Sequence, residues 1–311
     1  MAYGRIYKIT VITPTGFTLT IDNGDVDFSC TRDNEEEPNE ATLTIYGLTA
    51  DTQNQIAVAG SLVTVAAGYK DEGMPTLFQG ELSSAVTIKN DEVYALEIRL
   101  HESLIPYRAS TTSRTFAAGS SLNAAVQQVA KDMGLGAQLS PAAKTLNLSK
   151  NLSIAALSRE VLASLCAQCD AAWSIQYQSV IVTAGDAITA GAASISPESG
   201  LLGTPRLKIH TPKRRKKSAK TGKTAKSKKT VYPFPPPGAQ TDYSSGARRQ
   251  IGVIEGIVFR SVLRGGIEVG DTVELISPSL GTWWVVITSI KHRFGTRDHS
   301  VWETEYTGVI K

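Results

Sequence analysis

Asn39-Glu-Ala-Thr-Leu-Thr-Ile-Tyr-Gly-Leu48 is the stretch that decides the fold class. Ala41, Leu43 and Ile45 alternate with two threonines, and a period of two is typical of a strand whose successive side chains point to opposite faces. The same alternation returns between Tyr94 and His101. The two runs together predict a half-buried antiparallel sheet.

The first hundred residues continue this pattern on both sides of that stretch. Arg5 to Ile12 is rich in β-formers, and Thr49 to Val58 fits one short helix capped by Thr49 or Asp51. Turn residues separate the expected strands at Asn23-Gly24, at Asn90-Asp91 and in an acidic loop from Asp33 to Glu40. A barrel or sandwich of roughly 100 residues is the simplest interpretation.

The hydrophobic period then becomes that of a helix. Leu122, Val126 and Val129 recur at helical spacing, with Ser120 or Ser121 as the N-cap and Gly134 as the stop. A second helix is expected from Ser153 to about Asp170, and a strand from Trp173 to Thr183. Strand patterns resume after Ile195, and the two longest of them run over Trp283 to Ile290 and Val301 to Thr307.

We therefore expect a mainly β (α+β) chain with three parts. Two antiparallel β-barrel or sandwich domains, over residues 1–108 and 189–311, would flank a small α+β module with two helices at 109–188. A basic, proline-containing insertion at 211–248 interrupts the last domain. Lysine, serine, threonine and glycine cannot bury a core, so this insertion is expected to be a loop that is mobile or ordered by a partner.

The insertion carries the strongest charge signal of the chain. The net charge is only +3 over 311 residues, and ten cations without an intervening acid fall within one short run, so the remainder is mildly acidic. Such a run favours contact with a polyanion or an acidic protein surface, or is simply solvated, and it offers no aromatic platform for base stacking. The candidate contact residues are Lys213, Arg214, Arg215, Lys216, Lys217, Lys220, Lys223, Lys226, Lys228 and Lys229.

A proline run follows the cations within the same insertion. Tyr232-Pro-Phe-Pro-Pro-Pro-Gly238 cannot form a helix or a central strand. The run favours an extended, polyproline-like segment.

Several motifs have plainer explanations than chemistry. Cys166-Ala-Gln-Cys169 has redox spacing but falls near the predicted end of a helix, where the dipole does not activate a thiol, so we interpret the pair as structural thiols. Gly222-Lys223-Thr224 lacks the first glycine of a phosphate-binding loop. Glu303 and Glu305 fit a surface ladder. We expect no catalytic residue, cofactor or metal, and no secretion signal or membrane-spanning segment.

In their order and spacing, these strands resemble phage baseplate (tail) hub proteins. Three stretches are similar to the family's N-terminal strands: Asn39 to Leu48, Val63 to Tyr69, and Leu77 to Glu81. Further likeness lies in the middle helices and in the elements around Gly270-Asp271, Gly281 to Val286, His292 and Trp302 to Tyr306. The resemblance covers nearly the whole chain outside the insertion. Gly47 departs from the asparagine usual in the family, and the insertion is longer and more basic than expected.

The resemblance implies a structural virion component of contractile or long-tailed phages, assembled in the host cytoplasm. Family hubs form homotrimers with two tube-like β-domains per chain, so three chains match the hexameric tail tube. The implied partners are the tail tube protein, the central spike protein, baseplate wedge or distal tail proteins, the tape measure protein and, transiently, DNA in the lumen. Two alternatives stay open: a nucleic-acid-binding β-protein that uses the insertion, and a tail-associated cell-wall hydrolase with paired carboxylates.

Overall fold

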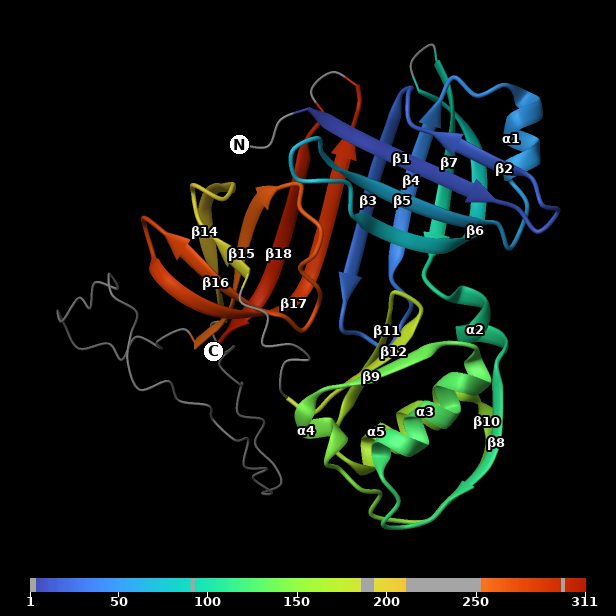
Figure 1. Cartoon of the computed structure of the whole chain (residues 1–311), viewed down its shortest axis with the longest axis vertical. Coiled ribbons are helices and arrows are strands. Elements are labelled where there is room, and N and C mark those ends of the chain that lie inside the picture. Colours follow the sequence, from blue (N-terminus) through green and yellow to red (C-terminus); the bar gives the residue numbers. More distant parts are fainter. Residues whose placement is uncertain (1–3, 91–92, 186–192, 211–252, 298–299) are drawn as a thin grey trace, which may run out of the picture.

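The computed structural model describes residues 4–90, 93–185, 193–210, 253–297 and 300–311. Strands form most of its regular structure (Figure 1). The first part contains β1 (Arg5–Ile12), β2 (Thr18–Ile21), β3 (Val26–Asp33), β4 (Glu40–Tyr46), α1 (Ala50–Ile56), β5 (Leu62–Tyr69), β6 (Thr76–Asn90) and β7 (Val93–His101).

The middle part contains the other four helices, and the last part is again made of strands. The middle elements are α2 (Leu104–Ala109), β8 (Thr111–Phe116), α3 (Leu122–Met133), β9 (Gly136–Leu139), α4 (Pro141–Lys144), β10 (Leu152–Leu157), α5 (Ser158–Gln168), β11 (Ala172–Gln176) and β12 (Ser179–Thr183). The last elements are β13 (Ala193–Ile195), β14 (Leu201–His210), β15 (Val253–Val262), β16 (Thr272–Ser277), β17 (Gly281–Gly295) and β18 (Trp302–Ile310).

One large sheet joins the two ends of the chain. Its main path runs β14-β15-β18-β17-β3-β4-β7-β6-β5-β1-β2, and β16, with β13 beside it, adds to β17. The connection between the halves is the antiparallel pairing of β3 with β17, in which Cys30 lies opposite His292. The path does not close into a barrel within the described residues. In Figure 1, β1 and β5 cross in front of β3, β4 and β7.

The alternating residues of the opening stretch fill the core between these layers. Leu43 pairs with Ile98 across β4 and β7, and both side chains are buried. The same core also contains Phe294 and Trp302 from the last two strands. Their rings lie 5.1 Å apart, and Phe294 lies 5.2 Å from Phe28 of β3. The end of the chain therefore helps to build the core of its beginning.

Two further cores lie under the middle and last parts. In the middle part, α3 and α5 pack Leu122, Val126 and Leu165 against Trp173 of β11. In the last part, Phe259 stacks on Tyr306 with ring centroids 5.2 Å apart. Burial of these apolar side chains is the main favourable contribution to folding.

The expectation of a mainly β fold with short helices is confirmed, and two of the predicted helices are placed well. α1 follows an N-cap at Thr49, and α3 runs from Leu122 to a left-handed Gly134. The predicted start of the second module helix at Ser153 is wrong, because residues 152–157 form β10 on β8 and α5 begins at Ser158. No helix among the described residues is long and apolar enough to span a membrane.

The single strand predicted over 173–183 is also wrong. It is a hairpin, β11–β12, whose two turn residues Tyr177 and Gln178 have positive φ angles of 47° and 56°. A two-residue turn with both φ values positive matches the right-handed twist of the strands that it joins.

Candidate assembly surface and buried junction

Eight strands of the large sheet form one antiparallel row with two open sides. The row runs from β14 to β6, and every neighbouring pair in it is antiparallel. At one side, β14 pairs only with β15 in the described part of the chain. At the other side, β5 pairs with β6 only from Thr76 to Glu81, so residues 83–90 pair with no described strand other than β7. Unpaired strand edges are ready to pair with another chain.

The outer face of this row is polar across both ends of the chain. One line of paired residues crosses seven strands with the residues Arg260, Glu305, Lys291, Thr31, Glu40, His101 and Glu81. The neighbouring line contains Glu303, which lies 3.2 Å from Arg260 and 3.8 Å from Arg293. Because the core lies between this row and the layer of β1 and β5, the polar face points away from that layer.

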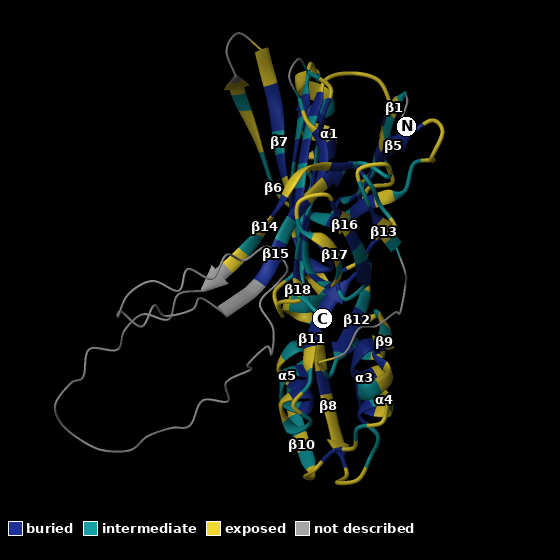
Figure 2. Ribbon diagram, turned by 90° about the vertical axis from the view of Figure 1, so that its left-hand side faces the viewer, coloured by how far each residue is buried: buried dark blue, intermediate teal, exposed yellow. Residues whose placement is uncertain are grey.

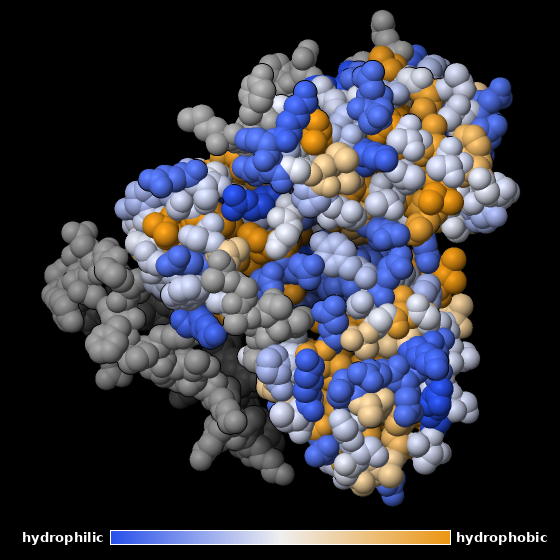
Figure 3. Space-filling model, in the orientation of Figure 1, coloured by the Kyte–Doolittle hydropathy of each residue, from blue (hydrophilic) through white to orange (hydrophobic). Residues whose placement is uncertain are grey.

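Two hairpins extend from the molecule on the side of the polar face. Figure 2 shows β6 and β7, and the coloured parts of β14 and β15, on the same side, opposite β1 and β5. The front face, in contrast, carries several separate hydrophobic patches among hydrophilic residues (Figure 3). The polar face and the two hairpin edges thus form one surface suited to contact with other chains.

The ten basic residues proposed as a contact site, Lys213 to Lys229, lie outside the described residues. Their place in the fold follows from their neighbours, because residues 211–252 join the end of β14 at His210 to the start of β15 at Val253. The predicted site is therefore attached to one of the two hairpins that border the polar face.

A buried polar cluster joins the middle part to the sheet, and sequence reasoning missed it. Arg32 of β3 is only 1% exposed, and its guanidinium lies over the Tyr177 ring at 3.4 Å. Its Nη2 donates to Gln176 Oε1 at 3.0 Å and lies 3.8 Å from Glu102 Oε1. Asn39 Nδ2 donates to Glu102 Oε2 at 2.8 Å and to the Ile175 carbonyl at 3.1 Å. These contacts hold the β11–β12 hairpin against the end of β3 and the start of β4.

Burial, together with the charge of Arg32, shifts the pKa values of two residues in and beside this cluster. Burial raises the pKa of Glu102, and the nearby Arg32 opposes that shift. Burial lowers the pKa of His292 to about 3, and Arg32 adds to this effect, so the imidazole is neutral near pH 7. Its Nδ1 lies 2.9 Å from the Thr304 hydroxyl. The sequence held one signal for the cluster: Arg32 occupies an inward position of β3, after Val26, Phe28 and Cys30.

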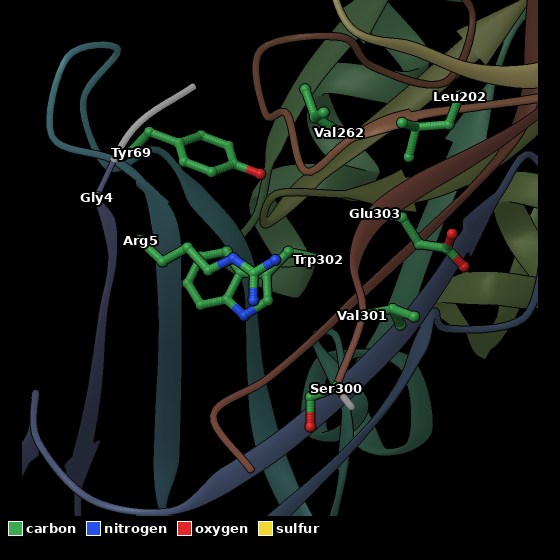
Figure 4. Close-up of a pocket in the computed structure, with 9 residues that line it drawn as sticks. All are labelled: Gly4, Arg5, Tyr69, Leu202, Val262, Ser300, Val301, Trp302 and Glu303. Carbon is green, nitrogen blue, oxygen red and sulfur yellow. The ribbon is translucent and has the colours of Figure 1, made fainter. Parts of the chain in front are cut away.

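A cleft of about 540 Å³ lies where the first strand meets the last ones (Figure 4). Arg5 of β1 lies over the Trp302 ring at 5.4 Å, beside Tyr69 of β5. Among the described residues, Glu303 is the only carboxylate that lines the cleft, and it lies within ion-pair distance of Arg260 and Arg293. The buried, ion-paired Glu303 contrasts with the exposed ladder that the sequence predicted. The described lining of the cleft therefore lacks the pair of carboxylates that glycoside hydrolysis uses.

Among the described residues, neither the cysteines nor the acidic side chains form a recognisable reactive site. Cys166 is buried in the last turn of α5, Cys169 is its C-cap, and burial raises the pKa of both thiols. Among residues with a described position, no group of three or more His, Cys, Asp and Glu side chains could hold a metal ion.

No protein-family model and no curated protein sequence matches the chain. Several solved structures, in contrast, are similar to this chain over most of its length. The 43 kDa tail protein of prophage MuSo2 from Shewanella oneidensis superposes with a TM-score of 0.62 at 13% identity, over 97% of this chain and 96% of that one. The tail protein from Neisseria meningitidis MC58 gives 0.61 at 11% identity, over 99% and 97%. The chain has a phage tail-protein fold.

A component of a bacterial secretion system has a similar fold. The Escherichia coli c3393 protein, a component of the type VI secretion system that is structurally similar to the T4 tail proteins gp27 and gp5, gives 0.51 at 9% identity, over 93% of this chain and 74% of that one. The resemblance inferred from the sequence is confirmed at the level of the fold.

Proposed function

We propose that the protein is a structural baseplate hub of a phage tail. Three copies would form a ring that adapts the hexameric tail tube to the central spike. The observation that carries the proposal is the eight-strand row from β14 to β6, which is continuous across the chain and open at both sides. The near-complete overlap of the fold with two phage tail proteins supports the same assignment.

Ring closure would pair β14 of one copy with the open part of β6 in the next copy. The eight strands alternate in direction, so the two end strands run opposite ways, and each new junction would be antiparallel like the others. Head-to-tail contacts of this kind close into a ring when the rotation between copies allows it. Closure would remove the exposed edges that favour aggregation.

The polar face would line the lumen of such a ring. Along the lines of paired residues described above, its serines, threonines and paired charges offer few apolar groups on which a passing chain would stick. This property suits a channel for a tape measure protein and for DNA. The far ends of the ring would meet the tail tube and spike proteins, and its periphery the wedge or distal tail proteins.

Within this proposal, residues 1–108 and 189–311 act as the two tube-like domains and 109–188 as a peripheral module. The basic residues Lys213 to Lys229 would contact a polyanion or an acidic partner by charge alone. Replacing them with serine and glycine should impair particle assembly or DNA delivery. Unchanged assembly together with unchanged delivery would remove this role.

Disulfide trapping tests the ring. In a Cys169→Ser background, Arg206→Cys on β14 is combined with Val86→Cys or Ile88→Cys on the open part of β6. Oxidation should give covalent trimers for at least one combination. A matched control, Arg206→Cys with Thr42→Cys, places the second thiol in the centre of the polar face and should give none. Only monomers in both test combinations would contradict the proposed closure.

The two rival functions make different predictions. A nucleic-acid-binding protein would bind DNA as a monomer with a steep salt dependence, and substitution of the basic residues would abolish binding. A cell-wall hydrolase would release fragments from peptidoglycan. The open edges favour the hub over both rivals.

A further inference from the structure

An apolar shelf lies on the outer face of the last strands, beyond the polar lines described above. We define the Trp284 shelf as Ile276, Trp284, Val286 and Val309. Val286 pairs with Val309, and Trp284 pairs with Glu274, two residues from Ile276, so all four side chains share the face opposite the core. Trp284 is 45% exposed, Val309 41% and Ile276 37%.

Among the described residues, the indole N–H of Trp284 has no hydrogen-bond acceptor. Trp283 Nε1 donates to the Leu280 carbonyl at 2.6 Å, and Trp302 Nε1 donates to the Gly295 carbonyl at 2.6 Å. Trp284 Nε1 makes no hydrogen bond within the described part of the chain. An exposed indole with a free donor and aliphatic neighbours is the kind of surface on which proline-rich segments dock.

The shelf lies close to the place where residues 211–252 leave and rejoin the sheet. Lys208 of β14 pairs with Gly256 of β15, and Ile257 pairs with Gly308, so Gly256 is level with Val309. Gly256 has no side chain that could stand between β14 and the shelf. At about 4.8 Å between strands, Trp284 on β17 is three strand spacings, or ~14 Å, from β14.

We propose that the proline run Tyr232 to Gly238 of the same chain docks on the Trp284 shelf. The tether is long enough, because residues 211–231 can extend over ~70 Å and residues 239–252 over ~45 Å, at about 3.3 Å per residue. Prolines have free carbonyls and no N–H groups, which suits the indole donor of Trp284. Their restricted backbone lowers the entropy cost of docking.

The proposal goes beyond the hub assignment and does not depend on ring formation. Docking would give the cationic run Lys213 to Lys229 a fixed anchor on its C-terminal side. The cations would then be held near the β14 edge.

Quenching of tryptophan fluorescence by acrylamide tests the docking. Trp173 and Trp302 are buried and Trp283 is half-buried, so Trp284 dominates the accessible signal. We compare the wild-type chain with a variant in which residues 232–238 are replaced by an equal length of glycine and serine. The replacement should increase quenching, and the increase should vanish in a Trp284→Phe background but persist in a Trp283→Phe background. Replacing Lys213 to Lys229 while keeping the prolines should leave quenching unchanged.

Equal quenching of the wild-type chain and the proline-replaced chain would overturn the proposal. Protection that disappears on dilution in step with the loss of oligomers would also overturn it, since a second copy would then cover the shelf. A synthetic peptide of residues 230–240, added to the proline-replaced chain, should restore protection, whereas the same peptide with serines in place of its prolines should not.

Discussion

Tyr177→Asn is expected to destabilise the protein although it improves the turn in which it lies. Asparagine tolerates a positive φ angle better than tyrosine, which favours the variant by about 1 kcal/mol. Against this, the variant loses the ring that covers the Arg32 guanidinium at 3.4 Å. Nε and Nη1 of Arg32 have no hydrogen-bond partner among the described atoms, so the ring is their main neighbour.

The loss outweighs the gain. A desolvated cation–π contact is worth about 2 kcal/mol, and burial of an aromatic side chain about another 2 kcal/mol. The net cost is about 3 kcal/mol, which corresponds to a fall in Tm of roughly 5 °C for a chain of 311 residues.

Thermal and urea unfolding of the purified protein measure this effect. The matched control is Gln178→Gly at the neighbouring exposed turn position, where relief of a φ of 56° should stabilise the protein by about 1 kcal/mol. If Tyr177→Asn were as stable as the wild type, the hairpin tip would have no role in fastening the middle part to the sheet.

Three further predictions concern other sites. Gly68→Ala should cost more than ~2 kcal/mol in urea unfolding, because the added Cβ would lie 2.1 Å from the Gly73 carbonyl oxygen; a neutral result would contradict the tight loop. Because the native His292 has a pKa of about 3 and the unfolded one about 6.5, stability should fall as the pH drops between these values, by up to ~1.4 kcal/mol per pH unit. His292→Gln should flatten that acid limb, and an unchanged limb would refute the assignment. Of the three thiols, only the half-buried Cys169 should react with a thiol reagent in the native protein, because burial raises the pKa to about 12 for Cys30 and Cys166.

The local hydrophobic pattern was sufficient to predict a helix or strand wherever one face of that element packs against a single core. The alternation of Ala41, Leu43 and Ile45 predicted β4, and the spacing from Leu122 to Met133 with Gly134 predicted α3. Pattern failed at residues 152–157, where six residues fit either a helix start or an edge strand and pairing with β8 decides. It also missed the turn at Tyr177 and Gln178, because neither residue type favours positive φ.

The assembly surface depends on contacts between distant parts of the chain. No local sequence pattern predicts that β3 pairs with β17, which lies more than 250 residues away in the chain. Nor does any local pattern predict that Phe294 packs in the same core as Phe28. The inward Arg32 was readable as an anomaly in an alternating strand, but its partners Glu102, Gln176 and Tyr177 come from three different elements. The basic run was evident from sequence, and its attachment to the β14–β15 hairpin required the fold.

The central claim is that this chain closes into a ring of three. Light scattering of the purified protein, alone and co-expressed with neighbouring proteins of its own gene cluster, gives the solution mass directly. The account predicts a hub mass near three times 33.2 kDa in at least one of these conditions. A stable monomer of 33.2 kDa in both conditions would contradict it.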